Sequence, residues 1–210
     1  MRADDLAVLL IRRKADPFRG DWALPGGFVN ENEALDRAAA RELQEETGLT
    51  GVKLEQLAAF GDPGRDPRGH TVTVAWMTFM VAEGKIKAGD DATEVEWHPF
   101  RTLQLEPPML GTKTKSRKAG VRLAFDHAKI VGRAYARLCK LLDDPTRDRA
   151  FDLFPSRFTI AQMHHFYECV LGMELPMRSF RKRLLDQGLV LPATAEPATK
   201  PASQLYRWNR

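Results

Sequence analysis

The feature that most constrains the fold is a glutamate-rich stretch, residues 26–49, in a chain whose formal net charge is +4. Glu42, Glu45 and Glu46 stand at positions i, i+3 and i+4, so a helix would place their carboxylates on one face. Apolar side chains fall on a second stripe, which we expect to pack against a sheet: Leu35, Ala38, Ala39 and Leu43. The stretch therefore predicts a helix with one acidic face and one packed face.

The ends of this helix carry local signals. We expect it to run from about Asn30 to Thr47, with Asn30 as its N-cap. Glu33 stands three residues after Asn30, as in a capping box. Gly48 suits the left-handed position that often ends a helix.

The spacing of the carboxylates also points to a chemistry. Three carboxylates that converge on one patch repel one another, and a hard divalent cation relieves that repulsion. Oxygen ligands without a nearby His or Cys indicate Mg²⁺ or Mn²⁺. Arg41 can hold one carboxylate in place, and Gly26 and Gly27 let the backbone approach a metal or phosphate closely. The alternative is a solvated acidic helix face.

The longer pattern favours the metal site. It has the form G-x5-E-x7-R-E-U-x-E-E-x-G-U, where U is aliphatic, and its fixed positions are Gly27, Glu33, Arg41, Glu42, Leu43, Glu45, Glu46, Gly48 and Leu49. This pattern resembles the Nudix box at every position. The flanking segments LLIRR and WALPGGF are also similar to this superfamily, and the resemblance covers about residues 4–105.

The resemblance implies a metal-dependent cut of a nucleoside diphosphate linked to another moiety. It implies that Glu42, Glu45, Glu46 and Gly27 bind the metal, and that Arg41 and Glu33 orient them. The superfamily draws its general base from the box or from a downstream loop. The candidates here are Glu46, which we favour, Asp91 and Glu94.

The loop GDPGRDPRGHTVTVAW resembles the corresponding segment of ADP-ribose-handling Nudix proteins. Arg65 and Arg68 are candidate diphosphate ligands, because a guanidinium binds phosphate in a fork. Arg13, in the LLIRR segment, is a further expected ligand contact. Trp22 or Phe28 is expected to stack on adenine. The alternatives are solvated loop charges for the two arginines and a core role for Trp22.

The strands and helices of the chain predict an α+β protein, and the resemblance implies a Nudix α/β/α sandwich followed by a winged helix-turn-helix domain. We expect a Nudix domain over residues 1–110, a linker and connecting helix over 111–150, and a winged helix over 151–210. Strands are expected at 6–12, 52–60, 71–81 and 92–97. Nudix domains usually have a strand before the first of these, and we expect this sequence to lack it. Helices are expected at 121–142, at 160–171 with Thr159 as cap, and from Pro176 to Gly188, followed by a hairpin of 189–191 with 204–208.

The last predicted helix gathers basic side chains in its first two turns. Phe180, Leu184 and Leu185 would form its apolar seam. The expected DNA contacts are Arg178, Ser179, Arg181, Lys182, Arg183 and, near the tip of the wing, Lys200. The alternative is a basic surface on a dimerisation or capping subdomain. Phe180, Arg181, Lys182 and the closing LYRWN resemble the winged helix of the Nudix-related transcriptional regulators of NAD metabolism, the NrtR type.

Composition bears on membrane insertion, secretion and cysteine chemistry. No apolar run reaches the roughly 18 residues that a membrane helix needs, and we see no secretory signal. Cys139 and Cys169 lack metal-type spacing, so we expect free thiols in a cytoplasmic protein. The basic segment Lys113–Lys118 allows an RNA-binding cap hydrolase, but it lacks aromatic residues to stack bases.

Two functions follow from the resemblance. The first is an ADP-ribose-responsive regulator, a homodimer that binds palindromic double-stranded DNA. The second is an ADP-ribose diphosphatase that releases AMP and ribose 5-phosphate and carries an accessory C-terminal domain. We favour a regulator that retains the hydrolase site.

Overall fold

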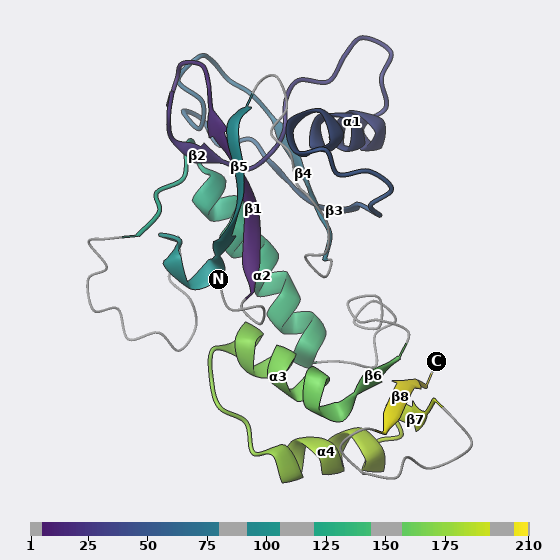
Figure 1. Ribbon diagram of the computed structural model, residues 1–210. Coiled ribbons are helices and arrows are strands. Elements are labelled where there is room, and N and C mark those ends of the chain that lie inside the picture. Colours follow the sequence, from purple (N-terminus) through teal and green to yellow (C-terminus); the bar gives the residue numbers. More distant parts are fainter. Residues whose placement is uncertain (1–5, 80–91, 106–119, 144–156, 194–203, 210) are drawn as a thin grey trace. The chain divides into compact units, whose positions relative to one another are not determined.

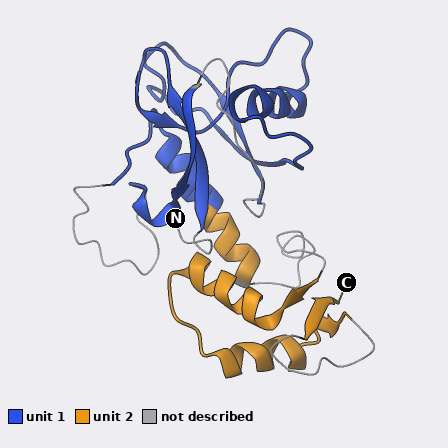
Figure 2. Ribbon diagram, viewed as in Figure 1, with its two compact units in different colours: residues 1, 6–134 blue, residues 2–5, 135–210 orange. Residues whose placement is uncertain are grey.

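The computed structural model describes residues 6–79, 92–105, 120–143, 157–193 and 204–209 (Figure 1). These residues form two compact units, residues 6–134 and 135–210 (Figure 2). Helix α2 (His127–Asp143) begins in the first unit and ends in the second. In the described part of the chain, no helix has the length and hydropathy needed to cross a bilayer. Some predicted features lie outside the described residues: Asp91, residues 111–119 of the linker with the basic segment Lys113–Lys118, and Lys200.

The first unit contains a three-stranded antiparallel sheet with β1 (Ala7–Arg13) at its centre. Its neighbours are β2 (Trp22–Ala23) and β5 (Ala92–Pro99), with Leu9 opposite Trp97 and Leu10 opposite Glu96 in the register of β1 with β5. Leu9, Leu10 and Ile11 are all buried. Such an apolar run without alternation is typical of a strand that is covered on both faces.

A second sheet of this unit is a two-stranded antiparallel pair of β3 (Glu55–Phe60) and β4 (Thr73–Met77). The loop between them, residues 61–72, holds Arg65 and Arg68. After β5 the chain makes a short 3-10 helix, η1 (Phe100–Thr102). The strands predicted for this unit are all present, each with somewhat different ends, and residues 80 and 81 of the strand predicted at 71–81 lie outside the described ranges.

Helix α1 spans Leu35–Thr47, so the predicted start at Asn30 is wrong. Asn30 and Glu33 instead form a turn before the helix. The Asn30 N–H donates to the Glu33 carboxylate at 2.9 Å, and the Glu33 N–H donates to the Asn30 carbonyl at 3.1 Å. The predicted end is confirmed, because Gly48 has a φ of 74° and donates its N–H to the Gln44 carbonyl.

The packed face of α1 differs from the predicted stripe. Ala38 is buried, but Leu35 is 48% exposed. Glu46 and Thr47 are buried instead. The acidic face thus turns partly inward, toward the loop that precedes the helix.

Helix α2 begins at His127, so the predicted start at Val121 is also wrong. The Val121 N–H donates to the Thr102 carbonyl in η1, and the Ala124 N–H donates to the Trp22 carbonyl in β2. These bonds hold the segment before α2 against η1 and β2. Phe125 has a φ of 53°, in the left-handed region, and this conformation prevents the helix from extending back through it. Leu123 and Ala124 are nevertheless buried, so their apolar character signals packing rather than a helix.

The second unit contains α3 (Ile160–Leu171) and α4 (Met177–Asp186). A three-stranded sheet in the order β6-β8-β7 completes it, formed by β6 (Phe158–Thr159), β7 (Val190–Pro192) and β8 (Leu205–Trp208). The predicted hairpin of β7 and β8 is confirmed, whereas β6 was not predicted because two residues carry no periodic signal.

Local signals at the ends of α3 are confirmed. Thr159 and Gln162 form a reciprocal capping box, and Gly172 ends the helix with a φ of 65°. The buried side chains of this unit include Phe158, Met163 and Val170. The Tyr135 hydroxyl donates to the Val170 carbonyl at 2.7 Å and so ties the later part of α2 to α3.

Candidate functional site

Arg41, in the middle of α1, binds three glutamates at once. It forms a two-pronged ion pair with Glu33 at 2.7 and 2.8 Å. Its Nη1 donates to Glu42 at 2.7 Å and to Glu45 at 3.1 Å, and its Nη2 donates to the Phe28 carbonyl at 3.1 Å. The arginine therefore joins the turn before the helix, the acidic face and the preceding loop.

These contacts stabilise charge on both sides. Hydrogen bonds from Arg41, followed by that from the Asn30 N–H, lower the pKa of Glu33 to about 2. The same carboxylates, Glu33 and then Glu42, raise the pKa of Arg41. Both groups are thus charged at any physiological pH.

The loop before α1 is held at two points. The Gly26 N–H donates to a carboxylate oxygen of Glu46 at 2.8 Å, and the Leu24 N–H donates to His127 Nδ1 at 2.9 Å. Gly27 lies so close to the Glu42 carboxylate that a Cβ at this position would overlap it. Because only glycine fits there, the backbone can lie directly against the acidic face.

The donor set of this face suits a hard cation, since it consists of carboxylate oxygens and nearby backbone. Glu42 and Glu45 have side-chain exposures of 17% and 57%, and Glu46 is buried. Within the described ranges, however, no three acidic, imidazole or thiol groups already form a metal-binding cluster. The reason is that Arg41 holds Glu42 and Glu45 while Gly26 holds Glu46, so a cation would compete with these partners. The metal assignment of Glu42, Glu45, Glu46 and Gly27 stays a prediction.

Of the other candidate bases, Glu94 lies on β5 and accepts two hydrogen bonds of 3.2 Å from Arg12. Both side chains of this pair are more than 40% exposed, at 43% and 47%. The structure thus pairs Glu94 with a strand arginine rather than with the acidic face of α1.

Arg65 is not a solvated loop charge. Its guanidinium donates to both oxygens of Asp126, at 3.0 and 2.7 Å, and to the Thr73 hydroxyl at 2.6 Å. The Arg65 and Asp126 side chains are only 5% and 9% exposed. This pair ties the 61–72 loop to the residue before α2, and its donors are already committed.

Arg68 lies between two aromatic rings. Its Cζ is 5.4 Å from the ring centroid of Phe28 and 5.5 Å from that of Phe125, and it forms an ion pair with Asp66 at 2.7 Å. The hydrogen bond from Arg68 is the main reason that the pKa of Asp66 falls to about 2. Phe28 is 68% exposed, as a stacking platform for a base would be.

Arg13 shares the Phe125 ring with Arg68. Its Cζ is 4.7 Å from the ring centroid, and its Nε donates to the Pro17 carbonyl at 2.9 Å. Burial first, and then the nearby charge of Arg68, lower the pKa of Arg13. Glu46 acts on Arg13 in the opposite sense, which places this arginine near the acidic helix.

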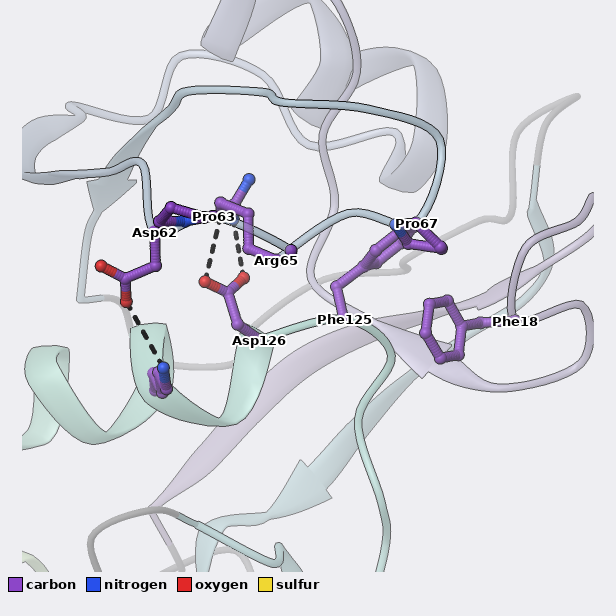
Figure 3. A pocket seen from close by; sticks show the side chains of 9 residues that line it. Phe18, Asp62, Pro63, Arg65, Pro67, Phe125 and Asp126 are labelled. Atoms are coloured by element: carbon purple, nitrogen blue, oxygen red, sulfur yellow. Dashed lines mark hydrogen bonds and ion pairs between the residues drawn. The ribbon is translucent and has the colours of Figure 1, made fainter.

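A cavity of about 340 Å³ opens beside these residues (Figure 3). Phe18 and Phe125 line it, with ring centroids 4.8 Å apart. The Arg65–Asp126 pair lines it as well, and Asp62 bonds Lys129 at 3.4 Å at the same cavity.

Trp22 is half-buried on β2. Its ring contacts His98 edge-on at 4.3 Å between centroids, and the Arg12 guanidinium lies 5.9 Å from its centroid. Trp22 also bridges to Leu123 through the backbone. These contacts favour the core alternative for Trp22 over stacking on adenine.

In the second unit, α4 presents a basic surface over a buried aromatic. Phe180 contacts Tyr167 and His164 edge-on, at 5.0 and 5.2 Å between centroids. The expected contacts with exposed side chains are Arg178, Ser179, Lys182 and Arg183. Arg181 is half-buried and donates to the Tyr206 hydroxyl at 3.4 Å. Leu184 is buried as predicted, but Leu185 is 39% exposed and lies outside the seam.

The turn between α3 and α4 is fixed by polar contacts. His164 Nε2 lies 2.7 Å from the Leu175 carbonyl, and the Leu175 N–H donates to Glu168 at 2.9 Å. These contacts set the position of α4 relative to α3 within the unit.

Sequence reasoning missed three consecutive residues of the first unit: Phe125, Asp126 and His127. They carry, respectively, the arginine platform, the partner of Arg65 and the acceptor for Leu24. The only available signal was the charged and aromatic FDH segment, which the helical pattern of its neighbours obscured.

Family models match both parts of the chain. The model of the NUDIX domain matches residues 1–118, and that of the NrtR DNA-binding winged helix domain matches residues 150–208. The ADPR responsive transcriptional repressor NtrR of Acinetobacter baylyi is 34% identical over 209 residues, which cover 97% of this chain and 76% of the repressor. An ADP-ribose pyrophosphatase of Methanocaldococcus jannaschii is 39% identical over 127 residues, 60% of this chain and 64% of that enzyme.

Solved structures agree. NrtR of Shewanella oneidensis is 28% identical, with a TM-score of 0.65 over 98% of this chain and 88% of its own. A structure of the same protein with a 27mer DNA is 27% identical to this chain, with a TM-score of 0.65 and the same coverage. Its NUDIX domain has been solved with ADP ribose, at 32% identity and a TM-score of 0.53 over 64% of this chain and 79% of that one. The predicted Nudix fold followed by a winged helix is confirmed. The chain belongs to the Nudix family, in the group whose members join a NUDIX domain to an NrtR-type DNA-binding winged helix domain.

Proposed function

We propose that this protein is an ADP-ribose-responsive transcriptional regulator that keeps a metal-dependent nucleoside-diphosphate hydrolase site. The observation that carries the proposal is the presence in one chain of the glutamate helix α1 and the basic helix α4, each in the context its chemistry needs. The likeness to a repressor that responds to ADPR, over nearly the whole chain, supports it.

DNA binding is assigned to α4 and the wing. Phe180 and Leu184 anchor one face of α4 in the core of its unit, while Arg178, Lys182 and Arg183 are exposed and Arg181 is half-buried. Arg178, Arg181, Lys182 and Arg183 supply phosphate and base-edge contacts, Ser179 a neutral one, and Lys200 a contact from the wing. A homodimer would present two such helices to the half-sites of a palindrome in the cytoplasm.

The nucleotide site is assigned to the first unit. When bound there, Mg²⁺ or Mn²⁺ would polarise the diphosphate and lower the pKa of water. Glu42, Glu45 and Glu46 would hold the ion, with the Gly27 backbone beside it. Arg41 and Glu33 fix the orientation of these carboxylates. Glu46 is our choice for the general base, because it lies on α1 and its carboxylate accepts a hydrogen bond from the Gly26 N–H.

The ligand contacts are assigned to the cationic and aromatic side chains near this face, with Phe28 as the base platform. Arg13 and Arg68 meet the diphosphate. Arg65 contributes by fixing the loop through Asp126. Trp22 supports the sheet beneath them.

A second candidate function is an ADP-ribose diphosphatase, in which water adds across the diphosphate and releases AMP and ribose 5-phosphate. The similarity of the first unit to an ADP-ribose pyrophosphatase favours it. The basic, outward face of α4 has no role in that reaction, so we rank this function second.

Two measurements on the full chain test the proposal. The first follows AMP release from ADP-ribose with Mg²⁺, with and without a chelator. Turnover that the chelator abolishes supports a retained active site, and its absence removes that part of the proposal.

The second measurement selects bound duplexes from a random-sequence pool and then titrates ADP-ribose into the selected complex. Enrichment of a palindrome whose affinity changes with ADP-ribose supports the regulator, because linkage requires the ligand to bind the free and DNA-bound states differently. A failure to enrich any sequence contradicts it.

A further inference from the structure

Phe125 is the residue at which the cavity and the arginines meet. Its ring lines the 340 Å³ cavity on one side, and the guanidinium carbons of Arg13 and Arg68 lie 4.7 and 5.5 Å from its centroid. Cation–π attraction of this kind holds a guanidinium without using its hydrogen-bond donors. A ring that contacts two arginines can thus hold them together without occupying any further N–H group of either.

The backbone at this point is held in a disfavoured conformation. Phe125 and Phe18 have φ angles of 53° and 64°, in the left-handed region that bulky residues rarely adopt. Their rings meet edge-on at 4.8 Å, and both pack against the buried cluster of Ile11, Ala23 and Ala124. Such outliers concentrate at functional sites, where surrounding packing maintains them. The two rings are therefore built into the fold as a pair.

The charges around the ring are unequal. Arg65 is neutralised by Asp126, and Arg68 is paired with Asp66. Arg13 makes hydrogen bonds to the carbonyls of Pro17 and Ala15, and within the described ranges it forms no ion pair with a carboxylate. Arg13 is thus the cation that an incoming anion can neutralise, and Arg68 stands next to it on the same ring.

We propose that Phe125 is a positioning residue that holds Arg13 and Arg68 as the diphosphate-binding part of the nucleotide site. The proposal rests on the proposed function where it takes the ligand to be ADP-ribose. A diphosphate bound by the two arginines would lie near the Phe125 ring, which also lines the cavity. Phe125 then acts on ligand affinity through the arginines rather than by contact with a base.

The test is a calorimetric titration of the full chain with ADP-ribose in the presence of a chelator, which prevents both turnover and metal-bridged binding. Phe125→Leu keeps apolar bulk but removes the π face, and we expect ADP-ribose to bind roughly tenfold more weakly. Phe125→Tyr restores the ring and should bind within about twofold of the original chain. Arg12→Gln, one residue from Arg13 on the same strand but paired with Glu94, is the matched control and should leave affinity unchanged.

A double-mutant cycle separates positioning from general damage. If Phe125 acts through Arg13, Phe125→Leu should cost little further affinity once Arg13→Gln is present. An equal loss in both backgrounds, or no loss at all, overturns the proposal. Thermal melting of each variant shows whether it remains folded.

Inorganic pyrophosphate, used as a second probe, separates this proposal from the proposed function. If the original chain fails to bind ADP-ribose, the assignment of the ligand falls. Pyrophosphate binding that Phe125→Leu weakens and Phe125→Tyr retains would still support the anion site. Pyrophosphate binding that is absent, or indifferent to Phe125, overturns it.

Discussion

The Arg65–Asp126 pair is predicted to be among the largest single contributions to the stability of the first unit. Arg65→Met removes the guanidinium and keeps a flexible apolar side chain of similar length. It leaves the Asp126 carboxylate, whose side chain is 9% exposed, without its two-pronged partner. The Thr73 hydroxyl also loses a hydrogen bond of 2.6 Å.

The expected magnitude follows from this burial. Removing one partner of a buried ion pair costs about 3–5 kcal/mol, because the remaining charge stays desolvated. That is a large share of the roughly 5–15 kcal/mol that stabilises a typical domain. Arg65→Lys keeps the charge but cannot form the two parallel hydrogen bonds, so its cost should be smaller but clear.

The assay is a urea unfolding titration in which tryptophan fluorescence is the recorded signal. Trp22, Trp76 and Trp97 belong to the first unit, and Trp208 belongs to the second. The fluorescence change therefore reports mainly on the first unit, which matters because a chain with two units need not unfold in one step.

The double variant Arg65→Met with Asp126→Leu decides the cause. If the cost of Arg65→Met is an unpaired carboxylate, the double variant should recover most of the lost stability, since an apolar pair often replaces a buried ion pair without penalty. A loss below about 1 kcal/mol for Arg65→Met would refute the reasoning, because pairs worth so little are typical of exposed surfaces.

Three further predictions concern the other sites. Glu45→Gln should abolish metal-dependent turnover while ADP-ribose binding largely persists, with exposed Glu31→Gln as control; unchanged turnover would contradict the metal assignment. Arg181→Ala should weaken DNA binding by about 1–3 kcal/mol without changing hydrolysis, whereas the control Arg133→Ala on α2 should leave both DNA binding and hydrolysis unchanged. If Arg181→Ala binds DNA at moderate salt as tightly as the original chain, the basic face of α4 belongs to a dimerisation or capping surface instead. Burial lowers the pKa of His127 from 6.5 to about 4. As the pH falls, His127 is therefore protonated at a higher pH in the unfolded chain than in the folded chain. The stability that neutral His127 contributes is therefore complete above pH 6.5 and decreases by about 3 kcal/mol toward pH 4. His127→Gln should flatten that part of a pH–stability curve, and a curve that keeps its slope would show that another group titrates there.

Local signals in the sequence were reliable where a few neighbouring residues decide the structure. Gly48 ends α1 in the left-handed conformation, and Thr159 with Gln162 forms a capping box at α3. Both depend on side chains and backbone within four residues of each other. Most strands and helices of both units followed from the same kind of information, but the two-residue strands β2 and β6 did not.

The contacts that the sequence did not reveal are long-range. Arg65 and Asp126 are separated by 61 residues, and Leu24 and His127 by 103. Asn30 and Glu33 illustrate the opposite error: the Glu33 carboxylate accepts from the Asn30 N–H, as a capping box predicts, but it also binds Arg41, and the helix begins only at Leu35. Tertiary partners thus overrode a correct local rule.

The carboxylates of helix α1 are stabilised by Arg41 and not by solvent alone. A solvated face would leave its carboxylates exposed, which holds for Glu45 but not for Glu46, which is buried, or for Glu42, at 17% exposure. Arg41 offsets the mutual repulsion by bonding Glu42, Glu45 and Glu33 together. Such a network holds Glu33, Glu42 and Glu45 around one guanidinium. If a metal ion binds this face as proposed, it would have to take Glu42 and Glu45 at least partly from Arg41, and we would then expect these hydrogen bonds to lower its affinity.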